Sequence, residues 1–208
     1  MKILKSISKW LLVILISLIG ILIFHKSLEY YKPDFSRGYL SDKEAVFDGI
    51  FKVGLYAHIV SVLPALLIGT LLIFFRLERK NRKLHRLLGK LYVLLVLFLA
   101  SPGGLILAFY AIGGFWGELA FISLSLLWWL FTFLAYKSAR NGKIQPHKNW
   151  MQKSYLLCLS AVNLRIFLFI ANHFLDLHGT EIYVIVSWLS WLPFLVVHEI
   201  VRRAKHNE

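Results

Sequence analysis

The chain has 208 residues, is 58% hydrophobic and carries a formal net charge of +13. A positive charge of this size can indicate nucleic-acid binding, but the basic residues lie mainly between apolar runs and form no platform interleaved with aromatic residues. We therefore expect no nucleic-acid partner, and we expect the basic loops to face anionic lipid headgroups. The single cysteine, Cys158, excludes a disulfide framework and a cysteine-based metal site.

Six apolar runs predict an all-α, polytopic membrane bundle. A helix needs about 20 apolar residues to cross a hydrocarbon core of about 30 Å. In chain order the runs are residues 10–24, 53–75, 91–112, 119–136, 155–175 and 182–201. We therefore expect six transmembrane helices in a lipid bilayer.

The distribution of basic residues predicts how these helices are oriented. With the N-terminus inside, 18 of the 24 Lys and Arg residues lie on the cytoplasmic face. The outer segments then hold five basic residues, all before Val53 and balanced by five acids. This asymmetry follows the positive-inside rule. It predicts that the N-terminus and the C-terminus are both cytoplasmic.

Changes in composition divide the chain into four parts. The first run follows three lysines but is not followed by a small-residue cleavage site, so we expect an uncleaved membrane anchor in residues 1–25. Residues 26–52 form an outer segment, in which we expect a short helix or lid resting on the bundle. We expect a four-helix membrane core in residues 53–177. The sixth helix and a cytoplasmic tail follow in residues 178–208.

The predicted core contains two similar helical hairpins. The third span begins with residues 85–92 and the fifth with residues 147–155, and each segment has a histidine, then a basic residue, then Lys-x-Tyr. A parallel repeat places a site near the repeat interface. A match this short can also arise by coincidence, so duplication and chance both remain open.

A Ser-Pro-Gly-Gly sequence, residues 101–104, lies in the middle of the third run. Proline removes a backbone donor, and glycine permits the close approach of another helix. We favour tight helix packing through these small residues. The alternative is unwound backbone that lines a site.

Arg165 is the most costly residue of the chain, because it lies near the middle of the fifth run. A charge there costs at least about 2.5–3.5 kcal/mol. Helical spacing places Cys158, Arg165 and Asn172 on one stripe, which should face the bundle interior. Arg165 and Asn172 are therefore candidates for binding an anionic ligand. The alternative is that Arg165 caps the interrupted backbone of the third span.

Histidines fall into two predicted layers. His58 and His173 lie near the outer face, and His85 and His147 lie near the inner face. Two neutral imidazoles at equal depth can hold a metal or a haem iron. We predict cofactor binding by His58 with His173, and by His85 with His147. His58 and His85 are the preferred metal ligands. The alternative is that the inner histidines contact phosphate headgroups and the outer ones hydrogen-bond between helices.

Catalytic residues cannot be assigned from motifs. The sequence has no nucleotide-binding loop, no nucleophile elbow, no His-Glu-x-x-His and no pair of carboxylates within the apolar runs.

A combination of histidine, glycine and aromatic residues between about residues 54 and 170 resembles a known family. The combination comprises His58, Gly69, His85, Arg86, Gly89, Tyr92, Gly103, Gly104, Gly113, Gly114, Trp128, Trp129, Ala135, Tyr136, His147, Lys148, Trp150, Met151, Ser154, Tyr155, Asn163, Leu164 and Arg165. It is similar to the bacterial predicted membrane proteins labelled domain of unknown function 2306, in which Arg is usual at the position of Lys148. The resemblance implies a multi-pass helical bundle in the bacterial inner membrane and brings no established activity.

A looser similarity is to di-haem membrane cytochromes b of the ascorbate-reductase and ferric-reductase kind. Those proteins hold haems between histidine pairs in four helices, stacked as an inner and an outer site. The inner histidines of this chain, His85 and His147, lie at the starts of their spans. That spacing departs from the cytochrome pattern.

Two functional classes follow. The first is an electron-transfer or quinone-linked membrane protein that binds haem b, in which Arg165 steadies a haem propionate or a quinone oxygen. The second is a small transporter, or an assembly or interaction subunit with a protein partner, that binds an anionic ligand or lipid near Arg165. Histidine layering alone does not decide between them.

Overall fold

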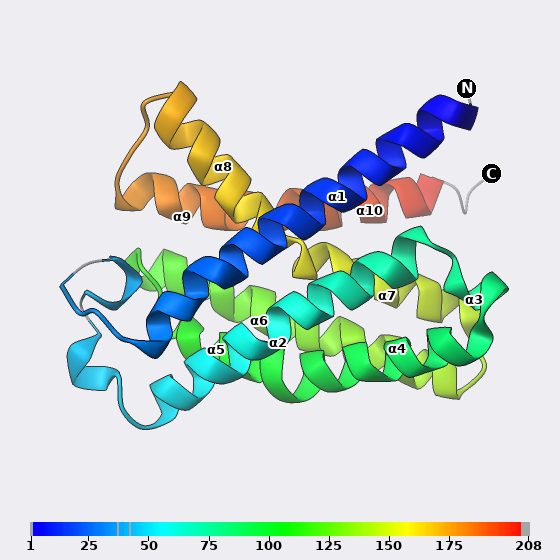
Figure 1. Ribbon diagram of the computed structural model, residues 1–208, viewed down its shortest axis with the longest axis horizontal. Helices are drawn as coiled ribbons and strands as arrows, with labels where there is room; N and C mark the ends of the chain where they lie inside the picture. Colours follow the sequence, from blue (N-terminus) through cyan, green and yellow to red (C-terminus); the bar gives the residue numbers. More distant parts are fainter. Residues whose placement is uncertain (1, 37, 42, 205–208) are drawn as a thin grey trace. The chain divides into compact units, whose positions relative to one another are not determined.

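Six helices of the computed structural model are long and apolar enough to cross a membrane, which confirms the predicted all-α fold (Figure 1). The structure describes residues 2–36, 38–41 and 43–204, and it has no strand in these ranges. Residues 205–208, the last part of the predicted tail, lie outside the described residues. The six spans are Ile7–Tyr31, Ile50–Phe74, Arg82–Ala108, Gly114–Arg140, Ile144–Phe174 and Thr180–Ala204.

The chain divides into two compact units, Met1–Ile106 and Leu107–Glu208. The predicted four-helix core, residues 53–177, draws on both units and stays a prediction. Unit 1 contains α1 (Lys2–Ser27), η1 (Leu28–Tyr31), η2 (Gly38–Leu40), η3 (Glu44–Val46), α2 (Ile50–Phe74), α3 (Leu77–Lys80), α4 (Arg82–Leu95), η4 (Val96–Ala100) and most of α5 (Ser101–Ala108). In this unit α1, α4 and η4 pack against α2.

The outer segment consists of short 3₁₀ turns that rest on the N-terminal end of α2. Tyr31 stacks on Tyr56 of α2 with ring centroids 4.8 Å apart. The Tyr56 hydroxyl donates a hydrogen bond to the carbonyl of Tyr30 at 3.1 Å. Leu40 and Phe51 are fully buried. Aromatic packing therefore ties this segment to the membrane helix, as expected for a short helical element resting on the bundle.

The third span is one continuous run of helix, and it lies further toward the N-terminus than predicted. It begins at Arg82 instead of residue 91, because Asn81 caps it by accepting a hydrogen bond from the backbone N–H of Leu84 at 2.9 Å. It ends at Ala108 instead of residue 112. The left-handed backbone of Gly113, with φ 102°, then begins α6.

The Ser-Pro-Gly-Gly sequence packs closely against α2. A Cβ built on Gly103 would lie 2.7 Å from the carbonyl oxygen of Gly54 and 2.9 Å from the backbone nitrogen of His58. The preference for packing is therefore confirmed, and the alternative of unwound backbone is wrong. The π-helical turn η4 explains why, because it precedes Pro102 and loosens the helix where the proline ring would meet the preceding turn.

Unit 2 contains α6 (Gly114–Arg140), α7 (Ile144–Cys158), α8 (Ser160–Phe174), α9 (Thr180–Leu189) and α10 (Leu192–Ala204). Its last two spans are each interrupted, the fifth at Leu159 and the sixth at Ser190 and Trp191. Figure 1 shows α8 turning away from the axis of α7. The Asn163 side-chain amide donates to the carbonyl of Ser190 at 2.9 Å, so it links the two interruptions.

We expect Gly103→Ala to destabilise the protein, because its methyl group would be forced against the backbone of α2. Overpacking of this kind costs about 1–3 kcal/mol. Gly89→Ala is the control, since a Cβ there would meet nothing within 4 Å and alanine favours helix. Thermal unfolding in detergent, followed by circular dichroism, should show a lower midpoint for Gly103→Ala only. Equal midpoints for the two variants would contradict the packing role.

Candidate functional site

His58 lies on α2 and faces the third span. Its Nδ1 is 2.7 Å from the carbonyl oxygen of Ala100, and Gly103 approaches its backbone. His147, in the first turn of α7, has a similar bond, with its Nδ1 2.9 Å from the carbonyl oxygen of Ala135 on α6. Each imidazole therefore bridges two helices of its own unit. For His58 this is the interhelical hydrogen bond that the alternative to cofactor binding predicts. For His147, that alternative predicted contact with headgroups instead.

His173 has a different environment. Its ring is exposed, its Nδ1 is 3.1 Å from the carbonyl oxygen of Phe169 on the same helix, and it stacks on the Phe169 ring at 4.4 Å. His85 is half-buried in the first turn of α4. The predicted haem pairs, His58 with His173 and His85 with His147, each have one member in each unit. Their pairing stays a prediction.

His58 and His85, the preferred metal ligands, lie at different levels of unit 1 and would not share one ion, and the role of each as a ligand stays a prediction. His58 is bonded at the level of Ala100, and His85 precedes Ala100 by 15 residues in one helical span. At 1.5 Å per residue the two levels are roughly 22 Å apart along the helix axis. Within the described residues no group of three or more His, Cys, Asp or Glu residues could hold a metal ion.

The expected position of Arg165 in the bundle interior is also wrong. Arg165 and Asn172 are exposed, whereas Cys158 is buried, so the three side chains do not share a face. The interruption at Leu159 is the cause, because helical spacing cannot be carried from α7 into α8. The Arg165 Nη1 lies 3.5 Å from the carbonyl oxygen of Ala161, in the preceding turn of its own helix.

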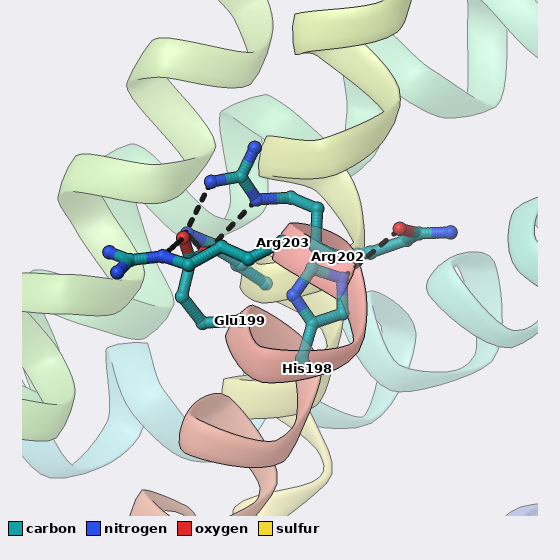
Figure 2. Close-up of polar contacts among 6 residues, drawn as sticks. His198, Glu199, Arg202 and Arg203 are labelled. Carbon is teal, nitrogen blue, oxygen red and sulfur yellow. Dashed lines mark hydrogen bonds and ion pairs between the residues drawn. The ribbon is translucent and has the colours of Figure 1, made fainter. Parts of the chain in front are cut away.

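A cluster of charges joins α7 to the end of α10, where these helices pack together (Figure 2). The Glu199 carboxylate accepts from the ammonium of Lys153 at 2.9 Å. It also accepts from the Arg202 guanidinium at 3.2 and 2.5 Å and from the Arg203 Nε at 3.0 Å. The side chains of Lys153 and Glu199 are 13% and 25% exposed. One carboxylate thus serves three cations.

Aromatic and polar neighbours hold this cluster in place. The Lys153 ammonium lies 4.8 Å from the ring centroid of Trp150 and 5.6 Å from that of Phe131, so cation–π attraction adds to its ion pair. His198 Nε2 lies 3.1 Å from the Gln152 side-chain oxygen. Together these contacts fix the side chains that α7 and α10 present to each other.

A pocket of about 920 Å³ lies beside the cluster, entirely within unit 2. Its charged residues are Lys148, Lys153, Arg202 and Glu199, so its lining carries an excess of positive charge. The other lining residues are Gln145, Pro146, Asn149, Trp150, Gln152, His198 and Val201. An excess of cations in a partly enclosed space favours binding of an anion.

Comparison with known families agrees with the earlier resemblance. The family model described as a predicted membrane protein, DUF2306, matches residues 55–202. This chain belongs to the DUF2306 family. No curated protein and no solved structure matches it significantly.

The DUF2306 match extends beyond the predicted region of resemblance, which ended near residue 170. It includes α9 and α10 as far as Arg202, and hence all the residues that line the pocket. The outer segment, residues 26–52, precedes the match. The pocket is therefore part of the family's own region of the chain.

Sequence reasoning missed this site because it used the basic residues of the loops to orient the spans and to expect contact with lipid headgroups in general. A signal was present in the last helix, where Glu199 is followed by arginines three and four residues later, a spacing that brings the side chains together on a helix. Nothing in the sequence indicated that Lys153, 46 residues earlier, would join them.

Proposed function

We propose that this DUF2306 protein is a membrane protein that binds an anionic group in the pocket formed by α7 and α10. The sharing of one carboxylate among Lys153, Arg202 and Arg203 is the observation that carries the proposal. Glu199 orients these cations but compensates only one of them. Lys148 adds a further positive charge to the pocket lining. A phosphate or carboxylate would offset this excess through charge-assisted hydrogen bonds.

We also infer that this pocket faces the cytoplasm. The charge distribution supports this orientation, because the α6–α7 turn and the end of α10 carry basic residues, as cytoplasmic segments do. The pocket then lies at the level of the headgroups of the inner leaflet. Both a transporter and an assembly subunit could use such a site, so anion binding is the property that the two share.

The double variant Lys148→Ala/Arg202→Ala tests anion binding. We expect the affinity of the detergent-purified protein for an anionic phospholipid to fall at least about tenfold, because two cations leave the pocket. Native mass spectrometry with an anionic and a zwitterionic lipid provides the measurement. Lys137→Ala/Arg140→Ala removes the same charge from the last turns of α6 and is the matched control. An equal loss in the control would show that net charge alone governs binding and would overturn the proposal.

The orientation can be tested with introduced cysteines. Cys158 is buried, so a membrane-impermeant maleimide should leave it unlabelled in intact cells. We expect labelling of Asp34→Cys, in the outer segment, and no labelling of Asn141→Cys, in the α6–α7 turn, until the cells are opened. The reverse pattern would place the pocket on the outer side.

Haem binding is a second candidate function, supported by the bonds of His58 and His147. A histidine that coordinates iron through Nε2 usually donates its Nδ1–H to a carbonyl or a carboxylate. Both residues have Nδ1 within hydrogen-bond distance of a backbone carbonyl on a neighbouring helix. The donor set therefore fits axial ligation of a b-type haem, which would supply one-electron chemistry.

Absorption spectra of protein purified from haem-supplemented cells test this second function. If haem is bound, dithionite reduction should give sharp Soret, α and β bands. His58→Ala and His147→Ala should each remove the absorption of the haem in its own predicted pair. His25→Ala, at the exposed end of α1, is the control and should retain the bands. A colourless, folded protein would exclude the cytochrome function.

A further inference from the structure

We propose that the pocket recognises a phosphate that carries a neighbouring hydroxyl group, supplied as the headgroup of a membrane lipid. This inference rests on the proposed anion-binding function and specifies its ligand. The pocket offers two kinds of polar group to a ligand. One kind is the set of cations already described, and the other is a pair of acceptor atoms.

The acceptor atoms belong to Asn149 and His198, which both line the pocket. The Gln152 oxygen can only accept, so the bond from His198 Nε2 places the imidazole proton on that nitrogen and a lone pair on Nδ1. Asn149 presents its side-chain oxygen. Both atoms are buried, and neither has a hydrogen-bond partner among the residues that the structure describes. Buried acceptors without donors are unfavourable, so a ligand that supplies donors is favoured once the two lining side chains turn these atoms toward it.

The donor must be uncharged. An ammonium group could donate to both acceptors, but Lys148, Lys153 and Arg202 line the same pocket and would repel it. A hydroxyl group donates without adding positive charge. A phosphate bonded to a short polyol therefore satisfies the cations with its oxygens and the acceptors with its hydroxyl groups.

The surroundings of the pocket favour a lipid over a soluble phosphate. Val201 lines the pocket, and on the same helix Val197 and Ile200 are 58% and 62% exposed. These side chains form an apolar strip on the sixth span that ends at the pocket. An acyl chain can lie along the strip while its headgroup enters the pocket, so one ligand is held by both surfaces.

The test compares two anionic lipids whose short headgroups differ mainly in their hydroxyl groups. Dioctanoyl phosphatidylglycerol has hydroxyl groups beside its phosphate, and dioctanoyl phosphatidylethanol has none. We expect the full-length protein in detergent to bind the first about tenfold more tightly, as one or two added hydrogen bonds would produce. Soluble glycerol 3-phosphate should bind more weakly than the hydroxylated lipid, because it lacks acyl chains.

Asn149→Leu/His198→Phe removes both acceptors and should abolish the preference, while the affinity for phosphatidylethanol changes less than about twofold. Asn141→Leu/His178→Phe makes the same two replacements on exposed residues outside the pocket and should keep the preference. If the first variant fails to fold, the comparison of the two lipids on the unmodified protein still decides the matter.

The outcomes separate this inference from the proposed function. Equal binding of both lipids, lost in Lys148→Ala/Arg202→Ala, would overturn the hydroxyl specificity and leave anion binding intact. Glycerol 3-phosphate binding as tightly as the lipid would overturn the lipid source. Failure of every anion to bind would overturn the proposed function as well.

Discussion

A backbone N–H or C=O group in the hydrocarbon core has no water to bond with, and this constraint decides where the helices of the chain can be interrupted. Two places in the spans show how the chain meets this constraint. The π-helical turn η4 precedes Pro102, which has no N–H, and helix continues through the proline. In the sixth span the side chain of Asn163 donates to the carbonyl of Ser190. The bends are therefore built into the fold, and they set the course of the helices that follow them.

The interruptions in unit 2 divide each of its last two spans into two halves, and the halves pack in pairs. α9 packs against α8, and α10 packs against α7. This arrangement brings Glu199, near the end of the chain, to Lys153. A carboxylate with limited exposure on a helix apolar enough to span a membrane is costly unless cations surround it, and Lys153, Arg202 and Arg203 provide them. The charge cluster is thus a consequence of helix packing as well as a contributor to it.

The number and type of the elements could be predicted because they depend on local composition. Apolar runs of the right length give membrane helices whatever packs around them, and the glycines near Pro102 indicated close packing. The ends of the third span were missed because an Asn cap extends a helix into polar sequence. The prediction that Cys158, Arg165 and Asn172 share one face was wrong for another reason. Its spacing assumed an unbroken helix, and nothing in the residues around Leu159 signals a break.

The candidate site could not be predicted because it depends on contacts between distant parts of the chain. Sequence analysis selected polar residues by their cost in the membrane, which favoured Arg165 and the histidines. The free-energy cost of a polar group in the membrane does not show whether its hydrogen bonds are made inside the fold or whether it can bind a ligand. That distinction needs the hydrogen-bond partners of each group, which only the structure supplies.

In unit 2 those partners separate the two kinds of polar group. At mid-span several hydroxyl groups are satisfied locally: those of Thr132 and Ser154 lie 2.7 Å apart, and that of Ser190 donates to the Ser187 carbonyl. Such bonds explain folding and leave little to offer a ligand. The Trp191 Nε1 is an exception, since it is buried without a partner among the described residues. Where α10 meets α7 the balance differs, because one carboxylate serves three cations. In addition, the half-buried Asn149 and His198 each keep a buried atom without a partner among the described residues. A binding site differs from a packed interior because some of its polar groups lack hydrogen-bond partners and lie beside an open pocket. The presence of polar residues alone does not make this difference.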